Sequence, residues 1–343
     1  MRATTGWQSH DHSTVLTRVP IERRDLRGDD IAVRIDYCGV CHSDLHRVRG
    51  TLFDEGDLVP GHEFTGTVTE VGADVSAFAV GDPVAVGTIV DSCGVCAMCE
   101  VGQENFCYNG ATSTYGLNRA DGSKTAGGYS REYVLREKFA YRLPAGLDPA
   151  AAAPLMCAGI TVWEPMRALG VRSGSRIAVA GLGGLGHLAV KFGVALGATV
   201  TVLSRTPEKA DDARKLGAVD LLHSDDDFAG ARGRFDLILD TISAPHEIPP
   251  LLHMAALDGT VSVLGYPGQI PLRVMDLIYG RKKLSSSGTG GRRGTAEMLA
   301  FAGEHGITAD VEVLPSGRIS DAFDRLDRGD VRYRFVLDLS DLD

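Results

Sequence analysis

A glycine-rich turn between an apolar strand and a helix constrains the fold of this chain more than any other feature. Residues 176–180 form a continuous apolar run that predicts a buried strand, and residues 183–196 predict a helix. The turn at residues 181–186 has the pattern G-x-G-x-x-G, and a second apolar strand is predicted at residues 199–203. The pattern alone is weak evidence, but this context indicates a dinucleotide-binding βαβ unit. A glycine-rich turn that binds no ligand is the alternative.

The glycines of this turn have separate expected roles. Gly181 allows the tight turn, and Gly183 lets backbone N–H groups approach a pyrophosphate at the N-terminus of the helix. Gly186 allows the helix to pack closely against the strand. We therefore expect the whole turn to contact the cofactor: Gly181, Leu182, Gly183, Gly184, Leu185 and Gly186.

The end of the second strand indicates which dinucleotide is bound. An NAD-binding protein usually has Asp or Glu here, which bonds the ribose 2′-hydroxyl and would repel a 2′-phosphate. This chain instead has Ser204, Arg205 and Lys209, which are a hydroxyl donor and two cations suited to a phosphate. The pattern favours NADP(H), with a solvated basic turn as the alternative.

The rest of the chain indicates two domains of different class. A length of 343 residues favours two domains, because single cores rarely grow beyond about 250–300 residues. Residues 1–149 predict a mostly β domain with strands at 31–37, 63–71 and 83–86. Residues 150–288 predict the alternating strands and helices of a doubly wound parallel sheet, with a helix at 207–216 and further strands at 235–240, 260–264 and 284–288. The last segment predicts helix, strand, helix and strand at 295–305, 311–314, 319–326 and 332–338, and we expect it to pack back onto the first domain.

Charge and composition exclude several classes of partner. The net charge of −10 argues against nucleic acid or an anionic membrane as a ligand. Residues 1–13 are polar and contain no apolar segment, so no secretory signal is predicted. The longest apolar stretch, residues 177–190, is too short and too glycine-rich to cross a membrane. We therefore expect a cytoplasmic protein, in which the clustered cysteines bind metal rather than form disulfides.

Four closely spaced cysteines predict a first metal site. Their side chains can form a closed tetrahedral set, which suits structural zinc. An iron–sulfur cluster is the alternative, but the spacing to the fourth cysteine fits neither common ferredoxin pattern. The predicted ligands are Cys93, Cys96, Cys99 and Cys107.

A second set of candidates is Cys41, His62 and Cys157. Catalytic zinc keeps three protein ligands and one open position, and two cysteines with one histidine are a known set. Three scattered residues are weak evidence, because a cysteine is commonly an inert core thiol. Cys38 forms a C-x-x-C pair with Cys41 and could replace it as a ligand. We interpret Cys38 as a buried thiol.

Together these features resemble the zinc-containing medium-chain alcohol dehydrogenases, and most closely their cinnamyl-alcohol-dehydrogenase-like, NADP-dependent branch. The matching segments extend over nearly the whole chain: residues 38–46, 60–63, 93–107, 127–130, 153–161, 181–186, 304–306 and 332–335. The resemblance implies a GroES-like zinc catalytic domain at residues 1–149 and 289–343. It implies a Rossmann NADP-binding domain at residues 150–288, with the active site in the cleft between the two.

The resemblance also assigns roles to individual residues. It makes Cys41, His62 and Cys157 the ligands of a catalytic zinc, and Glu63 the nearby carboxylate that can approach the metal when water leaves. Asp44 would orient His62. The proton relay would consist of Ser43 and His46. The expected cofactor contacts outside the glycine turn are His42, Thr161, Ser204, Arg205, Lys209, Thr241, Gly265 and Arg334, with Arg334 at the pyrophosphate.

The implied activity is that of a zinc-dependent, NADP(H)-linked alcohol dehydrogenase with two zinc ions per subunit, working mainly as an aldehyde reductase. Its substrates would be cinnamyl-type aromatic or medium-chain aliphatic aldehydes and alcohols. One alternative is a zinc-free quinone or enoyl reductase of the same fold, which would not need the ligand set. Another is a zinc-stabilised NADP(H)-binding scaffold or sensor, which would not need the relay.

Substrate range and assembly are the least transferable expectations. Residues 53–57 depart from the Trp-Gly segment that this branch commonly carries near the substrate mouth. We expect the pocket to be lined by Leu52, Phe53, Tyr115 and Ile278. The resemblance implies a homodimer joined through the edge strands of two Rossmann sheets, with a tetramer of two such dimers as the alternative.

Overall fold

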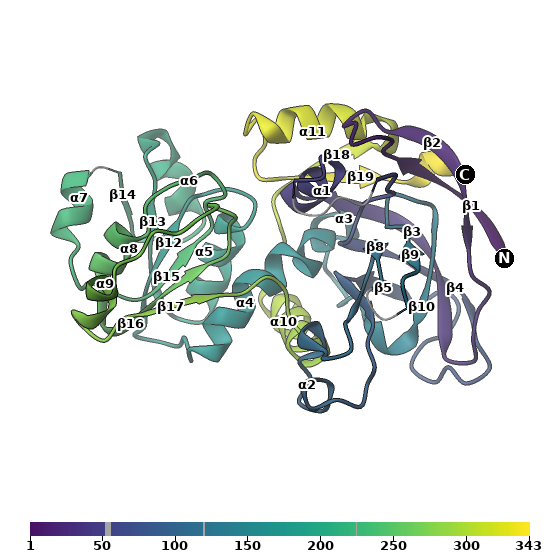
Figure 1. Cartoon of the computed structure of the whole chain (residues 1–343), viewed down its shortest axis with the longest axis horizontal. Coiled ribbons are helices and arrows are strands. Elements are labelled where there is room, and N and C mark those ends of the chain that lie inside the picture. The colour runs from purple at the N-terminus through teal and green to yellow at the C-terminus, as the bar shows by residue number, and fades with distance from the viewer. Residues whose placement is uncertain (52–55, 119–120, 224) are drawn as a thin grey trace. The chain divides into compact units, whose positions relative to one another are not determined.

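The structure is a computed structural model that describes residues 1–51, 56–118, 121–223 and 225–343. The described residues form two compact units. Unit 1 comprises Met1–Cys157 and Gly290–Asp343, and unit 2 comprises Ala158–Thr289 (Figure 1). Unit 2 is therefore inserted into unit 1, which is the order of segments that the sequence predicts.

Unit 1 is built around a mixed sheet with the strand order β11-β5-β4-β3-β19-β18, and β10 pairs with the N-terminal part of β3. Phe64 on β4 and Phe335 on β19 are fully buried and contribute to the core of the unit. Because β19 pairs with β3, the C-terminal segment, yellow in Figure 1, returns to unit 1, which confirms the prediction. The strands of this sheet are β3 (Asp30–Val40), β4 (Phe64–Val71), β5 (Pro83–Val86), β10 (Glu132–Arg136), β11 (Ala140–Arg142), β18 (Val311–Pro315) and β19 (Arg334–Asp338).

The other elements of unit 1 surround this sheet. An N-terminal hairpin, β1 (Arg2–Gln8) with β2 (Thr17–Arg23), was not predicted, because its residues do not alternate between apolar and polar. The C-terminal helices are α10 (Arg292–His305) and α11 (Ile319–Asp327). The shorter elements are α1 (His42–Val48), β6 (Ile89–Asp91), α2 (Ala97–Glu100), η1 (Glu104–Phe106), β7 (Thr112–Ser113), β8 (Gly116–Leu117), β9 (Lys124–Thr125), η2 (Glu137–Phe139), η5 (Ser316–Arg318) and η6 (Ser340–Leu342).

The chain first leaves unit 1 after Cys157, later than the expected boundary at residue 149. The intervening elements α3 (Pro149–Ala152) and η3 (Ala153–Met156) contact β3 and β4 and therefore belong to unit 1. The Thr65 hydroxyl, for example, donates a hydrogen bond to the Pro149 carbonyl at 2.9 Å. Cys157 is thus the last residue of unit 1 at this crossing.

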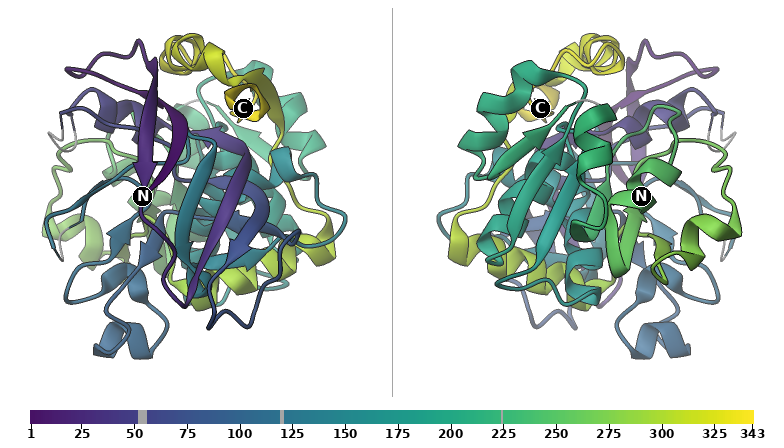
Figure 2. Two further views of the ribbon diagram at one scale, coloured as in Figure 1. Left: turned by 90° about the vertical axis from the view of Figure 1, so that its right-hand side faces the viewer. Right: turned by 90° about the vertical axis from the view of Figure 1, so that its left-hand side faces the viewer.

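Unit 2 contains a parallel sheet with the strand order β14-β13-β12-β15-β16-β17. This is the strand order of a doubly wound dinucleotide-binding sheet. Successive strands are added on one side of β12 as far as β14 and then on its other side from β15 onward, so the strand order switches between β12 and β15. Figures 1 and 2 show helices against both faces of the sheet. Its strands are β12 (Arg176–Ala180), β13 (Thr199–Leu203), β14 (Asp220–Leu222), β15 (Phe235–Asp240), β16 (Ala255–Val263) and β17 (Lys283–Ser286).

The helices of unit 2 follow the predicted alternation with small differences. The helix expected at residues 207–216 is η4 (Pro207–Lys209) followed by α6 (Ala210–Lys215). The others are α4 (Ala158–Ala168), α5 (Gly186–Ala195), α7 (Asp225–Gly230), α8 (Pro249–Met254) and α9 (Val274–Ile278). Among the described residues, no helix combines the length and the apolar character needed to cross a membrane.

Candidate active site

A buried carboxylate, Asp44, connects α1 to the segment before β4. Asp44 lies in the first turn of α1, and its Oδ2 accepts a hydrogen bond from the backbone N–H of Cys41 at 3.0 Å. Its Oδ1 accepts from the backbone N–H of Gly61 at 3.0 Å and pairs with His62 Nδ1 at 2.8 Å. The His62 ring is therefore held with Nδ1 toward the carboxylate, which leaves Nε2 available as a metal ligand.

The predicted catalytic ligands come together in unit 1. The ligand atoms of Cys41, His62 and Cys157 all lie within 4.8 Å of one another, and all three residues are buried. The two Sγ atoms are 4.0 Å apart, and His62 Nε2 is 3.2 Å from Cys157 Sγ. Tetrahedral zinc requires about 3.8 Å between two sulfurs and about 3.5 Å between sulfur and nitrogen, so the residues fit this metal.

The electrostatics of the two thiols also suit a cation. The hydrogen bond with Cys157 lowers the pKa of Cys41 well below its ordinary value, although burial opposes this shift. The same hydrogen bond and burial raise the pKa of Cys157. One thiolate is thus available before a metal binds, and a divalent cation would favour the second.

Glu63 and Arg334 form a buried ion pair beside the cysteine ligands. Arg334 Nη2 donates to Glu63 Oε1, and Arg334 Nη1 lies 3.8 Å from Cys41 Sγ. Glu63 Oε2 has no hydrogen-bond partner among the described residues. Burial raises the pKa of Glu63 to about 8, and the Arg334 guanidinium opposes the rise. Arg334, which the resemblance places at the pyrophosphate, is 2% exposed, and its guanidinium contacts Glu63 and Cys41 at the predicted metal centre.

Two buried tyrosines complete the surroundings of this centre. The Tyr129 hydroxyl donates to Asp44 Oδ2 at 3.2 Å, and Tyr129 is fully buried. The Tyr115 ring lies 5.7 Å from the His62 ring, and the Arg47 guanidinium lies over the Tyr115 ring, 4.4 Å from its centroid. The sequence alone assigns no role to Tyr129, although residues 127–130 are among the segments that carry the family resemblance.

The predicted relay residues lie on α1. Ser43 Oγ is 3.7 Å from Cys41 Sγ, which places its hydroxyl next to a ligand. The Nδ1 atom of His46 is 3.2 Å from the Thr51 hydroxyl, and its ring lies 6.4 Å from that of His42. His42 itself is exposed.

The alternative ligand Cys38 and the expected substrate-pocket residues do not all lie at this centre. Cys38 is buried, and its Sγ lies 3.7 Å from the Gly39 carbonyl, outside the ligand group. Of the expected pocket residues, Tyr115 is buried beside His62, whereas Ile278 is exposed on α9 in unit 2. Leu52 and Phe53 lie outside the described residues.

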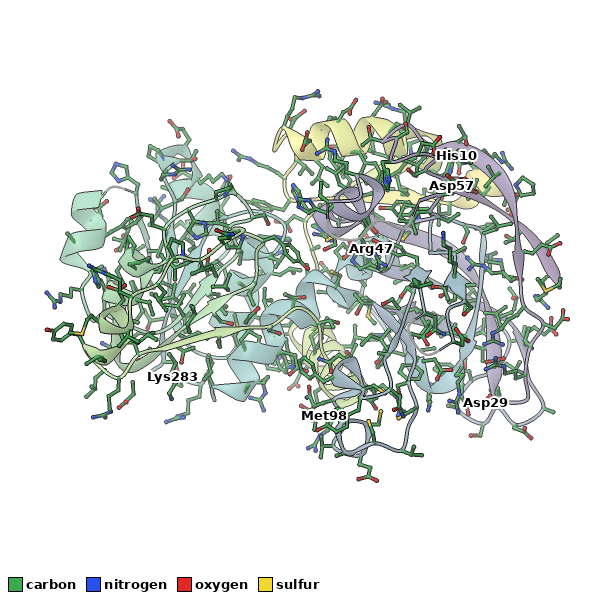
Figure 3. All side chains as sticks on the ribbon, in the orientation of Figure 1. His10, Asp29, Arg47, Asp57, Met98 and Lys283 are labelled. Atoms are coloured by element: carbon green, nitrogen blue, oxygen red, sulfur yellow. The ribbon has the colours of Figure 1, made fainter. Side chains whose placement is uncertain are left out.

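The second metal site is a cysteine lobe around α2. The Sγ atoms of Cys93, Cys96, Cys99 and Cys107 all lie within 4.8 Å of one another. Three of the six separations between these sulfurs are 3.6–3.9 Å, close to the about 3.8 Å expected for sulfurs around tetrahedral zinc. Hydrogen bonds from the backbone N–H groups of Cys99 and Tyr108 lower the pKa of Cys96 to about 6. Figure 3 labels Met98 on this lobe.

The glycine turn of unit 2 follows β12 directly. Gly181 has a φ of +88°, a conformation that favours glycine. A Cβ atom on Gly186 would lie 2.0 Å from the Gly181 carbonyl oxygen, so only glycine fits at the start of α5. A Cβ on Gly183 would meet nothing within 4 Å, so the backbone here is open to a ligand. The Thr241 hydroxyl lies 2.8 Å from the Ala180 carbonyl and 3.1 Å from that of Gly181.

The residues expected to contact a 2′-phosphate follow β13. Arg205 is exposed and has no carboxylate partner among the described residues. The Ser204 hydroxyl accepts a hydrogen bond from the Thr206 backbone N–H at 3.1 Å. Lys209 Nζ donates to the Leu182 carbonyl at 3.0 Å, so the ammonium group already lies against the glycine turn. Another expected cofactor residue, Thr161 on α4, donates to the Gly288 carbonyl at 3.2 Å.

The combination of a cysteine–histidine metal centre, a separate four-cysteine lobe and an inserted dinucleotide-type sheet defines the class of the protein as a zinc-dependent dehydrogenase. The comparisons agree. Residues 27–145 match the alcohol dehydrogenase GroES-like domain, and residues 184–304 match the zinc-binding dehydrogenase domain. The chain therefore belongs to the zinc-containing medium-chain alcohol dehydrogenase family, in its cinnamyl-alcohol-dehydrogenase-like branch, as the following relatives show.

Cinnamyl alcohol dehydrogenase 8 of Arabidopsis thaliana is 44% identical over 341 residues, which cover 98% of this chain and 95% of the plant protein. The probable formaldehyde dehydrogenase AdhA of Bacillus subtilis is 44% identical, covering 94% of this chain and 93% of its own length. Among solved structures, a Sorghum bicolor cinnamyl alcohol dehydrogenase has a TM-score of 0.94 at 40% identity, covering 99% of this chain and 98% of its own. The Helicobacter pylori cinnamyl alcohol dehydrogenase complexed with NADP(H) has a TM-score of 0.93 at 31% identity, covering 98% of both chains.

Proposed function

We propose that this protein is a zinc-dependent, NADP(H)-linked alcohol dehydrogenase that works mainly as an aldehyde reductase. The observation that carries this proposal is the buried group of Cys41, His62 and Cys157, whose three ligand atoms share the space of one tetrahedral ion. Three protein ligands leave a fourth position for a substrate oxygen. A structural zinc site, in contrast, has four protein ligands and no open position.

When bound, zinc would supply a Lewis acid for the carbonyl oxygen and NADPH the hydride. The chain itself holds His62 in one ring orientation through Asp44. The Ser43 hydroxyl beside Cys41 would donate a proton to the product oxygen, and His46 on the same helix would pass a proton from water. Alcohol oxidation would use the same groups in the reverse direction.

NADP(H) is the proposed cofactor because of the groups that follow β13. An exposed guanidinium at Arg205 and the hydroxyl of Ser204 stand where an NAD-binding protein places a carboxylate. A charge-assisted bond from Arg205 to a 2′-phosphate would favour the phosphorylated dinucleotide. The H. pylori relative was solved with NADP(H), which supports the same assignment.

The proposed substrates are small aldehydes and primary alcohols, either cinnamyl-type aromatic or medium-chain aliphatic. The relatives named cinnamyl alcohol dehydrogenase support the aromatic class, and the relative named formaldehyde dehydrogenase supports a smaller aliphatic aldehyde. Reduction would be the main direction, because cellular NADPH pools favour it.

We also propose a homodimer joined through the free edge of β17, with a tetramer as the alternative. In the strand order of unit 2, β17 is terminal and so has an unpaired side among the described residues. The helix before it exposes large apolar side chains, namely Val274, Met275 and Ile278. Lys283, labelled in Figure 3, marks the start of this edge strand. Light scattering during gel filtration would measure the mass in solution.

The test of the activity is a panel of aromatic and aliphatic aldehydes incubated with the zinc-loaded protein and either NADPH or NADH. The metal content is measured on the same sample. We expect the NADPH absorbance band to decrease on addition of at least one aldehyde, and less with NADH. Protein that contains two zinc ions per chain and binds NADPH, yet reduces no aldehyde, would favour the scaffold alternative instead.

A further inference from the structure

A buried carboxyl group in unit 2 has no role in the proposed reaction. Asp240 is the last residue of β15, at the point where the strand order reverses, and its side chain is fully buried. A buried carboxyl is costly unless it is hydrogen-bonded, so its partners indicate why it is retained. Its Oδ1 accepts a hydrogen bond from the Ile242 backbone N–H at 3.2 Å, and its Oδ2 lies 2.9 Å from His246 Nε2.

The second ring nitrogen of His246 also faces an oxygen atom. His246 Nδ1 is 2.9 Å from the Ala244 carbonyl oxygen, which can only accept a hydrogen bond. Nδ1 must therefore carry a proton. A hydrogen bond between Nε2 and Asp240 then requires one further proton, on the ring or on the carboxyl group. Burial raises the pKa of Asp240, and the neighbouring His246 opposes the rise.

The loop closed by this pair lies directly against the glycine turn. The Thr241 backbone N–H donates to the Ala180 carbonyl at 2.9 Å, and the Thr241 hydroxyl lies 3.1 Å from the Gly181 carbonyl. A Cβ atom on Gly181 would lie 3.1 Å from the Ile242 side chain. The loop and the turn thus share one packed surface.

The same loop also contacts the turn that follows β16. A Cβ on Gly265 would lie 2.2 Å from the Ile242 carbonyl oxygen, so the backbones approach as closely as glycine allows. The Gly265 and Leu264 backbone N–H groups both donate to the Asp240 carbonyl. A displacement of Ile242 would therefore move the glycine turn at residues 181–186 and the turn that contains Gly265. Both lie at the carboxyl end of the sheet, where ligands of doubly wound folds bind.

We propose that Asp240 and His246 form a clasp that holds residues 241–246 in the conformation that shapes the dinucleotide site, with His246 as a positioning residue for the cofactor. This inference rests on the proposed function, because it assumes that the glycine turn binds NADPH. His246 acts through Asp240 and Ile242 and does not itself take part in hydride transfer. Its loss should consequently weaken cofactor binding and leave the chemical step intact.

Three substitutions separate the two ring contacts. His246→Gln can keep a donor near the Nε2 position, whereas His246→Asn can keep one only near Nδ1. His246→Ala removes both. His253→Gln is the matched control, because His253 is an exposed histidine on α8 of the same unit. NADPH dissociation constants are measured by fluorescence titration, together with the KM for NADPH, kcat at saturating NADPH and the unfolding temperature of the cofactor-free protein.

We expect the Ala and Asn variants to bind NADPH about tenfold more weakly, with a matching rise in KM, because a hydrogen bond to a charged group is lost. Their kcat should stay within about twofold of wild type, since the zinc centre is untouched. The Gln variant should recover most of the affinity, and His253→Gln should match wild type.

Two results would overturn the clasp. One is wild-type NADPH affinity in folded Ala and Asn variants. The other is a lowered unfolding temperature in all three variants with no change in affinity, which would show a purely structural pair. If the Ala variant does not fold, the comparison of Gln with Asn decides. Wild-type protein that bound no NADPH would contradict the proposed cofactor itself, and the clasp with it.

Discussion

The carboxylate of Asp44 supports the catalytic ligands through four hydrogen bonds, and Asp44→Asn tests this support. Oδ1 receives the backbone N–H of Gly61 and the His62 ring, and Oδ2 receives the backbone N–H of Cys41 and the Tyr129 hydroxyl. An amide has only one oxygen, so its NH2 group must face one of these two pairs. At least one buried backbone or ring N–H then loses its acceptor.

The expected cost follows from this count. One unpaired buried donor costs about 1–3 kcal/mol, and weakening a charge-assisted bond to the imidazole adds about 1 kcal/mol, so we expect a loss of about 2–4 kcal/mol in the free energy of unfolding. The loss of the negative charge on the partner of a metal-binding histidine should reduce catalytic zinc affinity about 10–100-fold. The four-cysteine zinc should be retained, because Asp44 does not belong to that ligand group.

The assay is competition with a chromogenic chelator, followed by metal analysis and urea unfolding of the same preparation. Asp44→Asn should release one zinc ion per chain at chelator concentrations that leave wild type fully loaded. Asp57→Asn is the control, because Asp57 is an exposed carboxylate that pairs with His10 at 2.9 Å (Figure 3). Equal chelator resistance of Asp44→Asn and wild type would refute the reasoning.

Three further predictions concern other parts of the chain. Cys157→Ala should lower kcat about a thousandfold or more while NADPH titration shows near-normal binding; normal turnover would exclude the zinc assignment. Arg205→Asp should shift the ratio of kcat/KM values from NADPH toward NADH by about tenfold or more; an unchanged ratio would exclude the phosphate contact. Burial raises the pKa of Asp30, but hydrogen bonds from Arg24 and the Arg27 backbone outweigh it and leave the pKa lowered. The ionised carboxylate therefore stabilises the fold above its unfolded pKa of about 3.9, and this contribution is lost as pH falls through the folded value. Asp30→Asn should remove that part of the acid dependence in urea unfolding between about pH 5 and pH 2, and an unchanged dependence would contradict the pairing.

The parts of this fold that the sequence predicts are those with local signals. The strand, glycine turn and helix at residues 176–196 are contiguous, and the cysteine lobe lies within residues 93–107. Periodicity and spacing are therefore sufficient for both. The group of Cys41, His62 and Cys157 is different, because tertiary folding brings its members together across the sheet of unit 1. The residue types alone gave only a weak prediction of this set, and the family resemblance strengthened it.

Contacts made by single side chains across long separations could not be predicted. Arg334 and Glu63 pair across 271 residues, and Tyr129 reaches Asp44 across 85 residues. No periodic pattern encodes such pairs, because each depends on tertiary folding. The Arg334–Glu63 pair, for example, depends on the register between β19, β3 and β4. The resemblance implies a pyrophosphate contact for Arg334, and this contact stays a prediction. The Asp240–His246 pair gave no signal either, because both residue types are common in surface loops.

The two metal sites also relate to the two places where the chain crosses between its units. Cys157, a member of the proposed catalytic ligand group, is the last residue of unit 1 before the first crossing. The chain re-enters unit 1 at Gly290, and a Cβ on Gly291 would lie 1.9 Å from the Gly102 carbonyl of the cysteine lobe. The Glu104 carboxylate of that lobe accepts the Arg292 backbone N–H at 2.8 Å, at the N-terminus of α10. A short lobe with few apolar residues of its own can hold this junction only if its loop is ordered, and four thiolates on one ion provide that order. A zinc ion at the four-cysteine group would thus stabilise the segment that meets the chain at the second crossing.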